Sequence, residues 1–245
     1  MSYPPPPGPD RSPTPPSAPA GQHTPDGRWY WDGERWTAVA VSEPTWARPY
    51  APPQTRATAA VVLVAMAAAA EVPVLLGWIV ALVRALATGP QPGLTLPPLL
   101  AYVTTAALVL GLVGGAIAVP MWMHRAYRNL PALGEQGITW SPGWAAGGWF
   151  VPFANFVIPY LCLRDLWRGC GDERPLPKLY LAAWIASYVL LIPESAFFRA
   201  GPRPLRYVTA ILSDATLIVT GLVLITMIRR ISRRQRERQT EIRDG

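Results

Sequence analysis

Long apolar segments with almost no charge constrain this chain more than any other feature of its sequence. Four such segments cover residues 57–87, 99–123, 179–198 and 207–228. As helices, at about 1.5 Å per residue, each can cross a hydrocarbon core of about 30 Å. Charged residues gather instead near the two ends of the chain and between the second and third segments. The distribution predicts an all-α membrane protein with four transmembrane helices.

A fifth uncharged stretch, residues 140–163, has a different character. It is rich in tryptophan and phenylalanine and contains Pro142, Pro152 and Pro159. Proline interrupts the helical hydrogen-bond ladder, and lipid does not tolerate unsatisfied backbone groups. We therefore expect this stretch to be a re-entrant segment or an interfacial one with its tryptophans at headgroup level, and not a fifth span.

Basic residues fix the expected orientation. With four spans, one side of the membrane holds eighteen lysines and arginines, and the other holds three, with Arg84 near that border. Basic loops remain in the cytoplasm. We expect a multi-pass protein of a bacterial inner membrane with both termini cytoplasmic.

The chain before the first apolar segment divides into three parts. Residues 1–25 contain ten prolines and are predicted to be a disordered tail, either a linker or a ligand for an aromatic groove. Residues 26–41 are predicted to form a Trp-rich β-hairpin module, and residues 42–56 a second linker. No cleaved signal peptide is expected, because a basic and then apolar opening is lacking.

Two Asp-Gly dipeptides, each followed by aromatic or β-favouring residues, indicate the hairpin. We predict strands at 28–31 and 36–39 with a turn between them. Trp29 and Trp31 then share one face of the sheet, where Trp36 can cover them.

Glu71 lies near the middle of the first apolar segment. A carboxylate at that depth costs roughly 2.5–3.5 kcal/mol unless it is protonated or partnered. The favoured interpretation is a protonated carboxyl hydrogen-bonded to Thr104, Thr105 or Ser187. The alternative is a proton or cation site.

Three further charged residues lie within the apolar segments: Arg84, Glu194 near the far end of the third, and Asp214. Asp214 is about two turns into the fourth segment, and Arg84 approaches the same level from the first. We expect the two to form a structural ion pair, which neutralises both, in preference to a transport relay.

A basic and aromatic pocket is predicted on the cytoplasmic side, where it could hold an anionic lipid headgroup. The alternative is ordinary positive-inside charge with snorkelling arginines, and Asp165 is then expected to pair with Arg168. The candidate residues are Arg125, Arg128, Trp140, Trp144, Trp149, Asn155, Arg164, Asp165 and Arg168.

Residues 229–245 form a polybasic tail with six arginines between positions 229 and 238. A helix leaving the membrane with this charge is expected to bind anionic lipid at the cytoplasmic face. Binding to nucleic acid is not expected, because the tail has no aromatic residues to stack on bases.

Signals for enzymatic chemistry are absent from the sequence. It lacks a nucleophile elbow, a zinc-protease helix motif and a phosphate-binding loop. Cys162 and Cys170 indicate neither a disulfide framework nor a zinc site. We expect no metal, no cofactor and no enzymatic activity.

Three motifs together resemble a known family. "MHRAYRNLPALG", "WSPGWAAGGWFVPFANFVIPY" and "RDLW" are similar to the signature of the domain-of-unknown-function 4328 family of actinobacterial membrane proteins, over residues 57–236. A Trp-Asp-Gly hairpin ahead of such a domain also resembles a known pairing. The resemblance implies a membrane-embedded helical domain and implies no activity, substrate or catalytic residue.

The functional prediction is a non-enzymatic anchor, scaffold or sensor whose cytoplasmic tails bind partners, while the helical body contacts membrane lipids. The alternative is a small transporter or channel that uses Glu71 and Asp214. Four spans leave little room for a pore unless the protein is a homo-oligomer. The small residues Ala107, Gly111 and Gly115 offer a surface for such an assembly.

Overall fold

The computed structural model describes most of the chain as two compact units, residues 1–45 and 46–245. The residues described are 21–23, 29–38, 49–89, 97–135, 138–170, 174–200 and 203–244. Residues 1–20 of the predicted disordered tail and residues 42–48 of the predicted linker lie outside this part, whereas residues 54–56 of that linker belong to the first long helix.

The N-terminal unit contains the predicted hairpin. Strands β2 (Trp29–Trp31) and β3 (Trp36–Ala38) are antiparallel, with Trp31 opposite Trp36. The two indole rings lie 5.5 Å apart and both side chains are buried. The Asp32 carboxylate fixes the turn, because its Oδ1 accepts the N–H groups of Glu34 and Arg35, both at 2.8 Å.

A third strand was not predicted. β1 (Gln22–His23) pairs with β2 and completes a sheet in the order β1-β2-β3. These residues belong to the stretch expected to be a disordered tail. Sequence reasoning missed the strand because two polar residues carry no alternating pattern.

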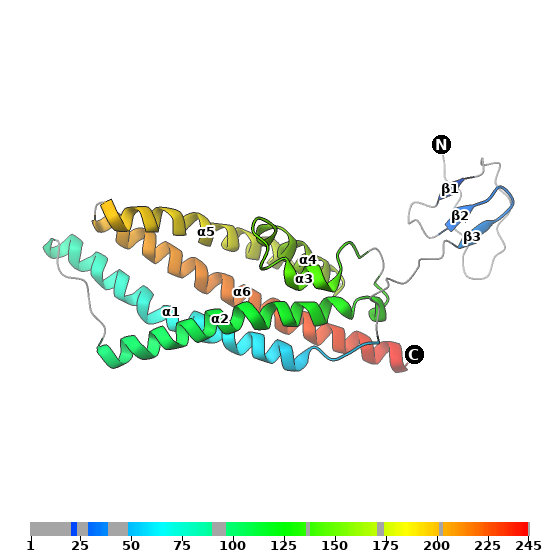
Figure 1. Ribbon diagram of the computed structural model, residues 1–245, viewed down its shortest axis with the longest axis horizontal. Coiled ribbons are helices and arrows are strands. Elements are labelled where there is room, and N and C mark those ends of the chain that lie inside the picture. The colour runs from blue at the N-terminus through cyan, green and yellow to red at the C-terminus, as the bar shows by residue number, and fades with distance from the viewer. Residues whose placement is uncertain are drawn as a thin grey trace. The chain divides into compact units, whose positions relative to one another are not determined.

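Four long helices make up the second unit, and each extends beyond the apolar segment that predicted it. They are α1 (Gln54–Thr88), α2 (Pro98–Arg128), α5 (Leu176–Ala200) and α6 (Arg203–Asp244). Figure 1 shows that successive long helices run in opposite directions, so α1 begins and α6 ends at the same end of the bundle. By length and composition α1, α2 and α6 can cross a membrane. In α5, the stretch 176–190 is apolar but shorter.

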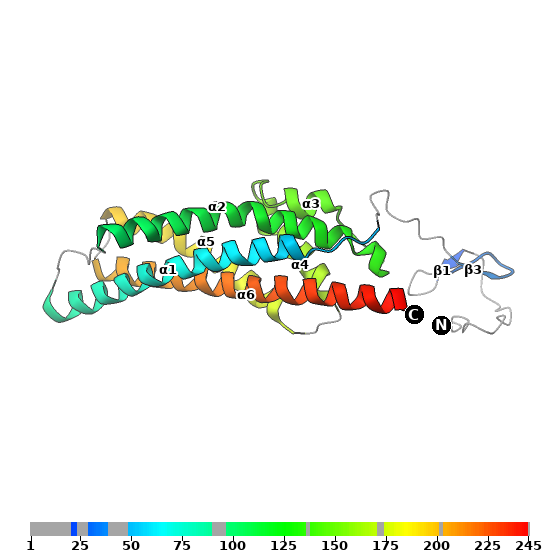
Figure 2. The same ribbon diagram turned by 90° about the horizontal axis from the view of Figure 1, so that it is seen from below.

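The long helices are not packed evenly around a ring. α1 packs along both α2 and α6, and α6 packs along α5 (Figures 1 and 2). In the described part of the chain α2 and α5 make no comparable contact. The bundle is therefore open between α2 and α5.

Small residues allow α1 and α2 to approach closely. A Cβ atom at Gly111 would lie only 2.6 Å from the backbone nitrogen of Ala67. The predicted small-residue stripe is thus confirmed as a helix-packing surface. Gly111 and Gly115 are both buried within the chain, so this stripe is not free for a second copy. Homo-oligomerisation itself stays a prediction.

Residues 140–163, which we call the aromatic stretch, fold into short helical pieces, consistent with their prolines. The stretch contains α3 (Pro142–Gly147), a 3-10 turn η2 (Ala154–Phe156) and α4 (Ile158–Arg168), and another 3-10 turn, η1 (Pro131–Leu133), precedes it. Pro142 and Pro159 lie in the first turns of α3 and α4, where proline is tolerated. The stretch packs between α2 and α5 near one end of the bundle (Figure 1).

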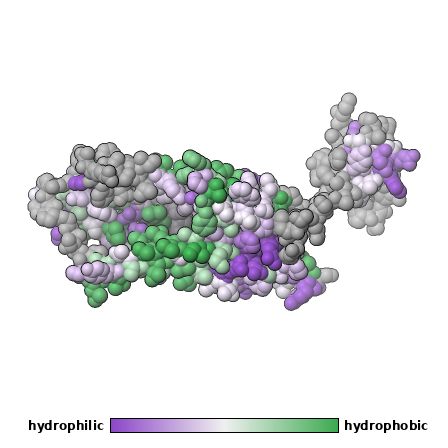
Figure 3. All heavy atoms as spheres, in the orientation of Figure 1, coloured by the Kyte–Doolittle hydropathy of each residue, from purple (hydrophilic) through white to green (hydrophobic). Residues whose placement is uncertain are grey.

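Exposed apolar side chains cover the middle of the helical unit. Figure 3 shows hydrophobic residues gathered there, while strongly hydrophilic residues gather toward the end that carries the C-terminus. Leu99 and Tyr102 are each 76% exposed, and Phe153, in the aromatic stretch, is 85% exposed. An apolar surface of this extent is expected to contact lipid.

The contact at Gly111 generates a stability prediction. We expect Gly111→Ala to lower the thermal midpoint of the detergent-solubilised protein, because the added methyl overpacks the α1–α2 contact at a cost of roughly 1–3 kcal/mol. Gly115→Ala is the matched control, since its Cβ would meet its nearest neighbour at 3.7 Å. Equal midpoints for the two variants, measured by fluorescence-detected thermal unfolding, would contradict the proposed close contact.

Candidate functional site

An apolar cavity of about 310 Å³ lies inside the helical unit. All four long helices and the aromatic stretch contribute to its wall. The small residues of the wall are Ala67 and Ala68 of α1, Gly111, Gly115 and Ala116 of α2, and Gly221 of α6. Because these side chains are short, the helix axes come close together and still leave space between them.

The helix arrangement explains where the cavity lies. α1 and α6 form one wall through Val64 and Leu224, while Leu112 of α2 and Trp184 of α5 line the sides that do not pack on each other. Trp149, Phe150 and Asn155 line it from the aromatic stretch. The cavity therefore occupies the opening between α2 and α5.

Asn155 and Trp149 supply polar groups to the residues that line the cavity. Asn155 Nδ2 donates to the Tyr188 hydroxyl at 3.2 Å. Asn155 Oδ1 and Trp149 Nε1 are buried and have no hydrogen-bond partner in the described part of the chain. One acceptor and one donor thus remain unsatisfied beside a largely apolar cavity, where a missing hydrogen bond is costly.

Glu71 also lines the cavity and is only 8% exposed. The hydrogen-bond partners predicted for Glu71 are wrong. Thr104 and Thr105 form no hydrogen bond with Glu71, and Ser187 donates to the Trp184 carbonyl within α5 at 2.7 Å. Glu71 does have an interaction within the chain, so it is not an isolated charge.

Aromatic contacts hold the stretch against α5. Trp149 meets Trp184 edge-on with ring centroids 5.6 Å apart, and Phe156 meets Tyr188 at 4.9 Å. Trp184 also contacts Tyr188 at 5.1 Å. Such pairs contribute roughly 0.5–1.5 kcal/mol each beyond their burial. They hold Trp149 and Asn155 in the lining of the cavity.

The predicted basic and aromatic pocket is divided by the fold. Trp149 and Asn155 line the cavity, whereas Arg125, Arg128, Arg164 and Arg168 do not. Trp140 and Trp144 pair with each other, with ring centroids 6.4 Å apart, and do not line the cavity. The sequence placed these residues on one side of the membrane, but only packing could show that they belong to different clusters.

Asp165 is the centre of one of these clusters. It pairs with Arg164 at 3.3 Å, and not with Arg168 as predicted. The Tyr127 hydroxyl donates to the other oxygen of Asp165 at 3.4 Å and accepts the backbone N–H of Trp140 at the same distance. The cluster joins α2, α4 and the aromatic stretch.

Arg125 and Arg128 lie in a second basic cluster on α2, beyond the apolar segment that ends at residue 123. Burial, together with the nearby guanidinium groups of Arg56, Arg128 and Arg125, keeps the pKa of His124 below its ordinary value. His124 is therefore neutral at pH 7, and the arginines carry the charge of this cluster.

The predicted ion pair between Arg84 and Asp214 is not found. Arg84 is exposed near the end of α1, whereas Asp214 is buried in α6 at 8% exposure. No ion pair joins these two residues in the described structure. Asp214 has another interaction within the chain.

A buried polar network fastens the end of the bundle. The Trp122 indole donates to Ser232 Oγ at 2.9 Å, and the Gln235 amide donates to the Ala126 carbonyl at 2.9 Å. Asn129 bonds both the N–H and the C=O of Ala51, at 3.1 and 2.9 Å. The first part of the predicted polybasic tail is thus a packed continuation of α6.

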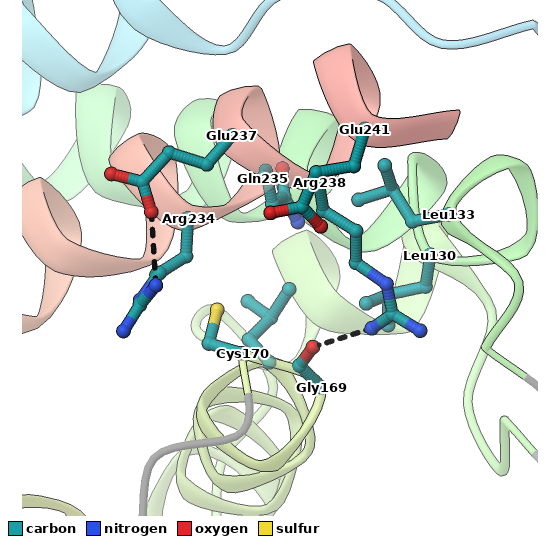
Figure 4. A pocket seen from close by; sticks show the side chains of 10 residues that line it. Leu130, Leu133, Gly169, Cys170, Arg234, Gln235, Glu237, Arg238 and Glu241 are labelled. Carbon is teal, nitrogen blue, oxygen red and sulfur yellow. Dashed lines mark hydrogen bonds and ion pairs between the residues drawn. The ribbon is translucent and has the colours of Figure 1, made fainter. Parts of the chain in front are cut away.

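A small pocket of about 170 Å³ lies beside this network (Figure 4). Its charges are compensated internally, because Arg238 pairs with Glu135 and donates to the Gly169 carbonyl at 2.9 Å, and Arg234 pairs with Glu237. The pocket therefore joins α6 to the end of α4, and because Glu241 also lines it, it carries no surplus positive charge for an anionic ligand. In the part of the chain that the structure describes, no three His, Cys, Asp or Glu side chains gather as metal ligands.

These features define a helical, membrane-type protein with a cavity inside its bundle. A family model, Domain of unknown function (DUF4328), matches residues 94–233. The chain belongs to this family. The match begins just before α2, so α1 precedes the matched region although it forms one wall of the cavity. Comparisons with curated proteins and with solved structures gave no match.

The two cysteines differ enough to give a chemical prediction. Burial and the nearby Asp165 carboxylate raise the pKa of Cys162 to about 12, so its thiol stays protonated at pH 8. Cys170 is only half-buried. We expect maleimide at pH 8 to modify Cys170 and to leave Cys162 intact, as measured by mass spectrometry. Modification of the native Cys170→Ser variant would refute this assignment, and the denatured chain, which should react at both sites, is the control.

Proposed function

We propose that this chain is a four-span protein of a bacterial inner membrane, a non-enzymatic anchor or sensor that binds a lipid-like molecule in its cavity. The observation that carries the proposal is the cavity itself, a largely apolar space whose lining includes Trp149 and Asn155, which hold a buried donor and a buried acceptor without a hydrogen-bond partner in the described structure. Binding sites for small molecules commonly combine apolar walls with a few convergent polar groups.

The charge distribution supports a cytoplasmic location for both termini. α1 begins and α6 ends at the end of the bundle where the arginines of residues 229–238 gather. The apolar aromatic stretch lies near this end and is proposed to enter the membrane or its interface from the cytoplasm.

With a membrane-impermeant maleimide, Cys170 should react in inside-out vesicles and not in right-side-out vesicles. The reverse pattern would contradict this orientation.

The chemistry of the cavity defines the class of ligand. Trp149 Nε1 is a donor and Asn155 Oδ1 an acceptor, both buried in residues that line the cavity, so a ligand hydroxyl or amide would satisfy both once these side chains turn toward it. The apolar wall suits a hydrocarbon body, which can leave through the opening between α2 and α5 toward lipid. A single-chain amphiphile with a neutral polar head satisfies both requirements.

Filling the cavity should abolish this binding. Leu112 lines the cavity and is 52% exposed, so a larger side chain can be accommodated there without disturbing the core. We expect Leu112→Trp to reduce cross-linking of a photoactivatable long-chain alcohol several-fold. The labelled positions, mapped by mass spectrometry in the wild-type chain, should lie on cavity residues of α1 and α6.

Leu110→Trp is the matched control, because Leu110 is a leucine of the same helix that is 62% exposed and does not line the cavity. It should label like the wild type. Equal labelling of both variants, spread over the outer faces of the helices, would refute a cavity site.

Glu71 favours one alternative function. A buried carboxyl in the wall of a membrane-embedded cavity is the arrangement expected for a proton-coupled or cation-coupled transporter. If this alternative holds, proton flux into proteoliposomes that contain the wild-type protein should be lost in Glu71→Gln. Flux that is absent from the wild type, or unchanged in the variant, would exclude it.

A further inference from the structure

A second site follows from a groove at the end of the bundle where α1 begins, separate from the cavity. The groove lies between the start of α1 and the arginine-rich part of α6 and measures about 310 Å³. Gln54, Thr58 and Val62 line it from α1, and Arg229, Arg233 and Arg236 from α6. We call it the basic groove. None of these six residues belongs to the candidate pocket expected from the sequence.

Helical periodicity brings the three arginines together. Positions 229, 233 and 236 are spaced by four and three residues, so their side chains leave α6 on one face. Gln54, Thr58 and Val62 are each four residues apart, so they also lie on one face of α1. The side-chain amide of Gln54 donates to the Ser232 carbonyl at 3.2 Å and holds the two helices side by side at this point.

The positive charge of the groove is mostly uncompensated. Arg229 and Arg236 form no ion pair with any residue of the described chain. Arg233 has only a contact of 3.7 Å with Glu237, and its side chain is 66% exposed. This distinguishes the basic groove from the neighbouring pocket of Figure 4, where the arginines are paired with carboxylates or carbonyls.

The groove also crosses the boundary between polar and apolar surface. Arg229 directly follows Ile228, the last residue of the apolar segment of α6, while Val62 is a 57% exposed apolar residue of α1. One end of the groove therefore offers cations and an amide, and the other offers a hydrocarbon surface. A soluble anion would contact only the end of the groove with the cations and the amide.

We propose that the basic groove binds a membrane phospholipid with an anionic headgroup. The phosphate contacts Arg229, Arg233 and Arg236, and an acyl chain lies along the apolar wall near Val62. Guanidinium groups suit this role because they form charge-assisted, bidentate hydrogen bonds with phosphate. The proposal rests on the proposed membrane disposition but not on occupancy of the cavity.

The test is a titration of the full-length detergent-solubilised chain, with bound lipid counted by native mass spectrometry. Dioleoyl phosphatidylglycerol should bind more tightly than dioleoyl phosphatidylcholine. The double variant R229Q/R236Q should weaken phosphatidylglycerol binding about tenfold or more, since each arginine near an anionic lipid contributes appreciably. Thr58→Glu, which keeps all the arginines and places a carboxylate in the groove, should weaken it as well.

The matched control is R35Q/K178Q, which removes the same number of charges from two exposed basic residues outside the groove and outside the predicted lipid-binding clusters. It should bind phosphatidylglycerol like the wild type. Equal loss in the two double variants, or equal binding of the two phospholipids, would overturn the proposal. Competition by inorganic phosphate at comparable concentration would assign the groove to a soluble anion and would also overturn it.

The two proposed sites can be separated with the same variants. Leu112→Trp should keep phosphatidylglycerol binding, and R229Q/R236Q should keep labelling by the photoactivatable alcohol. If the photoactivatable alcohol labels neither the wild type nor any variant while phosphatidylglycerol binding still depends on Arg229 and Arg236, the proposed cavity function is wrong and the proposed basic groove is supported.

Discussion

The close contact between α1 and α2 is the constraint on which the helical unit depends. At Gly111 the backbone of α2 lies against Ala67 with no space for a methyl group. In a membrane, helices gain no hydrophobic energy by leaving lipid, so close backbone packing of this kind provides much of the attraction. On another face of α1, Gly221 of α6 packs near Val64 and Ala68. α1 is thus held between α2 and α6.

This placement of α1 determines where a cavity can form. Because α2 and α5 each pack on a different neighbour, they do not close on one another. The aromatic stretch fills part of the opening, and Trp149 and Asn155 line the remaining space. The family match begins just before α2, so the helix that completes the cavity wall is contributed by a part of the chain outside the matched region.

At the end of the bundle where α1 begins, hydrogen bonds replace small-residue packing as the means of fixing the helices. The polar groups of three buried side chains form hydrogen bonds that link α2 and the residue after it to α6. These side chains are Trp122, Asn129 and Gln235. This network makes the arginine-rich part of α6 a rigid element and not a loose tail. The basic groove is a consequence, since its arginines are held at fixed positions beside α1 and not distributed along a mobile segment. A rigid set of cations can select a headgroup, whereas a mobile one only accumulates charge.

The sequence by itself determined the helical class of the protein and the positions of the long helices, including the continuation of α6 into its arginine-rich part. It also determined the division of the aromatic stretch by Pro142 and Pro159 and the β2–β3 hairpin. These features follow from hydropathy, proline chemistry and turn residues, which act over short distances along the chain. Partners across the fold were decided only by the tertiary structure. Asp165 pairs with Arg164 and bonds Tyr127, Arg84 and Asp214 remain apart, and Asn155 lies with Glu71 in one cavity. Such pairings depend on the rotation and depth of each helix against its neighbours, and side-chain packing between helices fixes both.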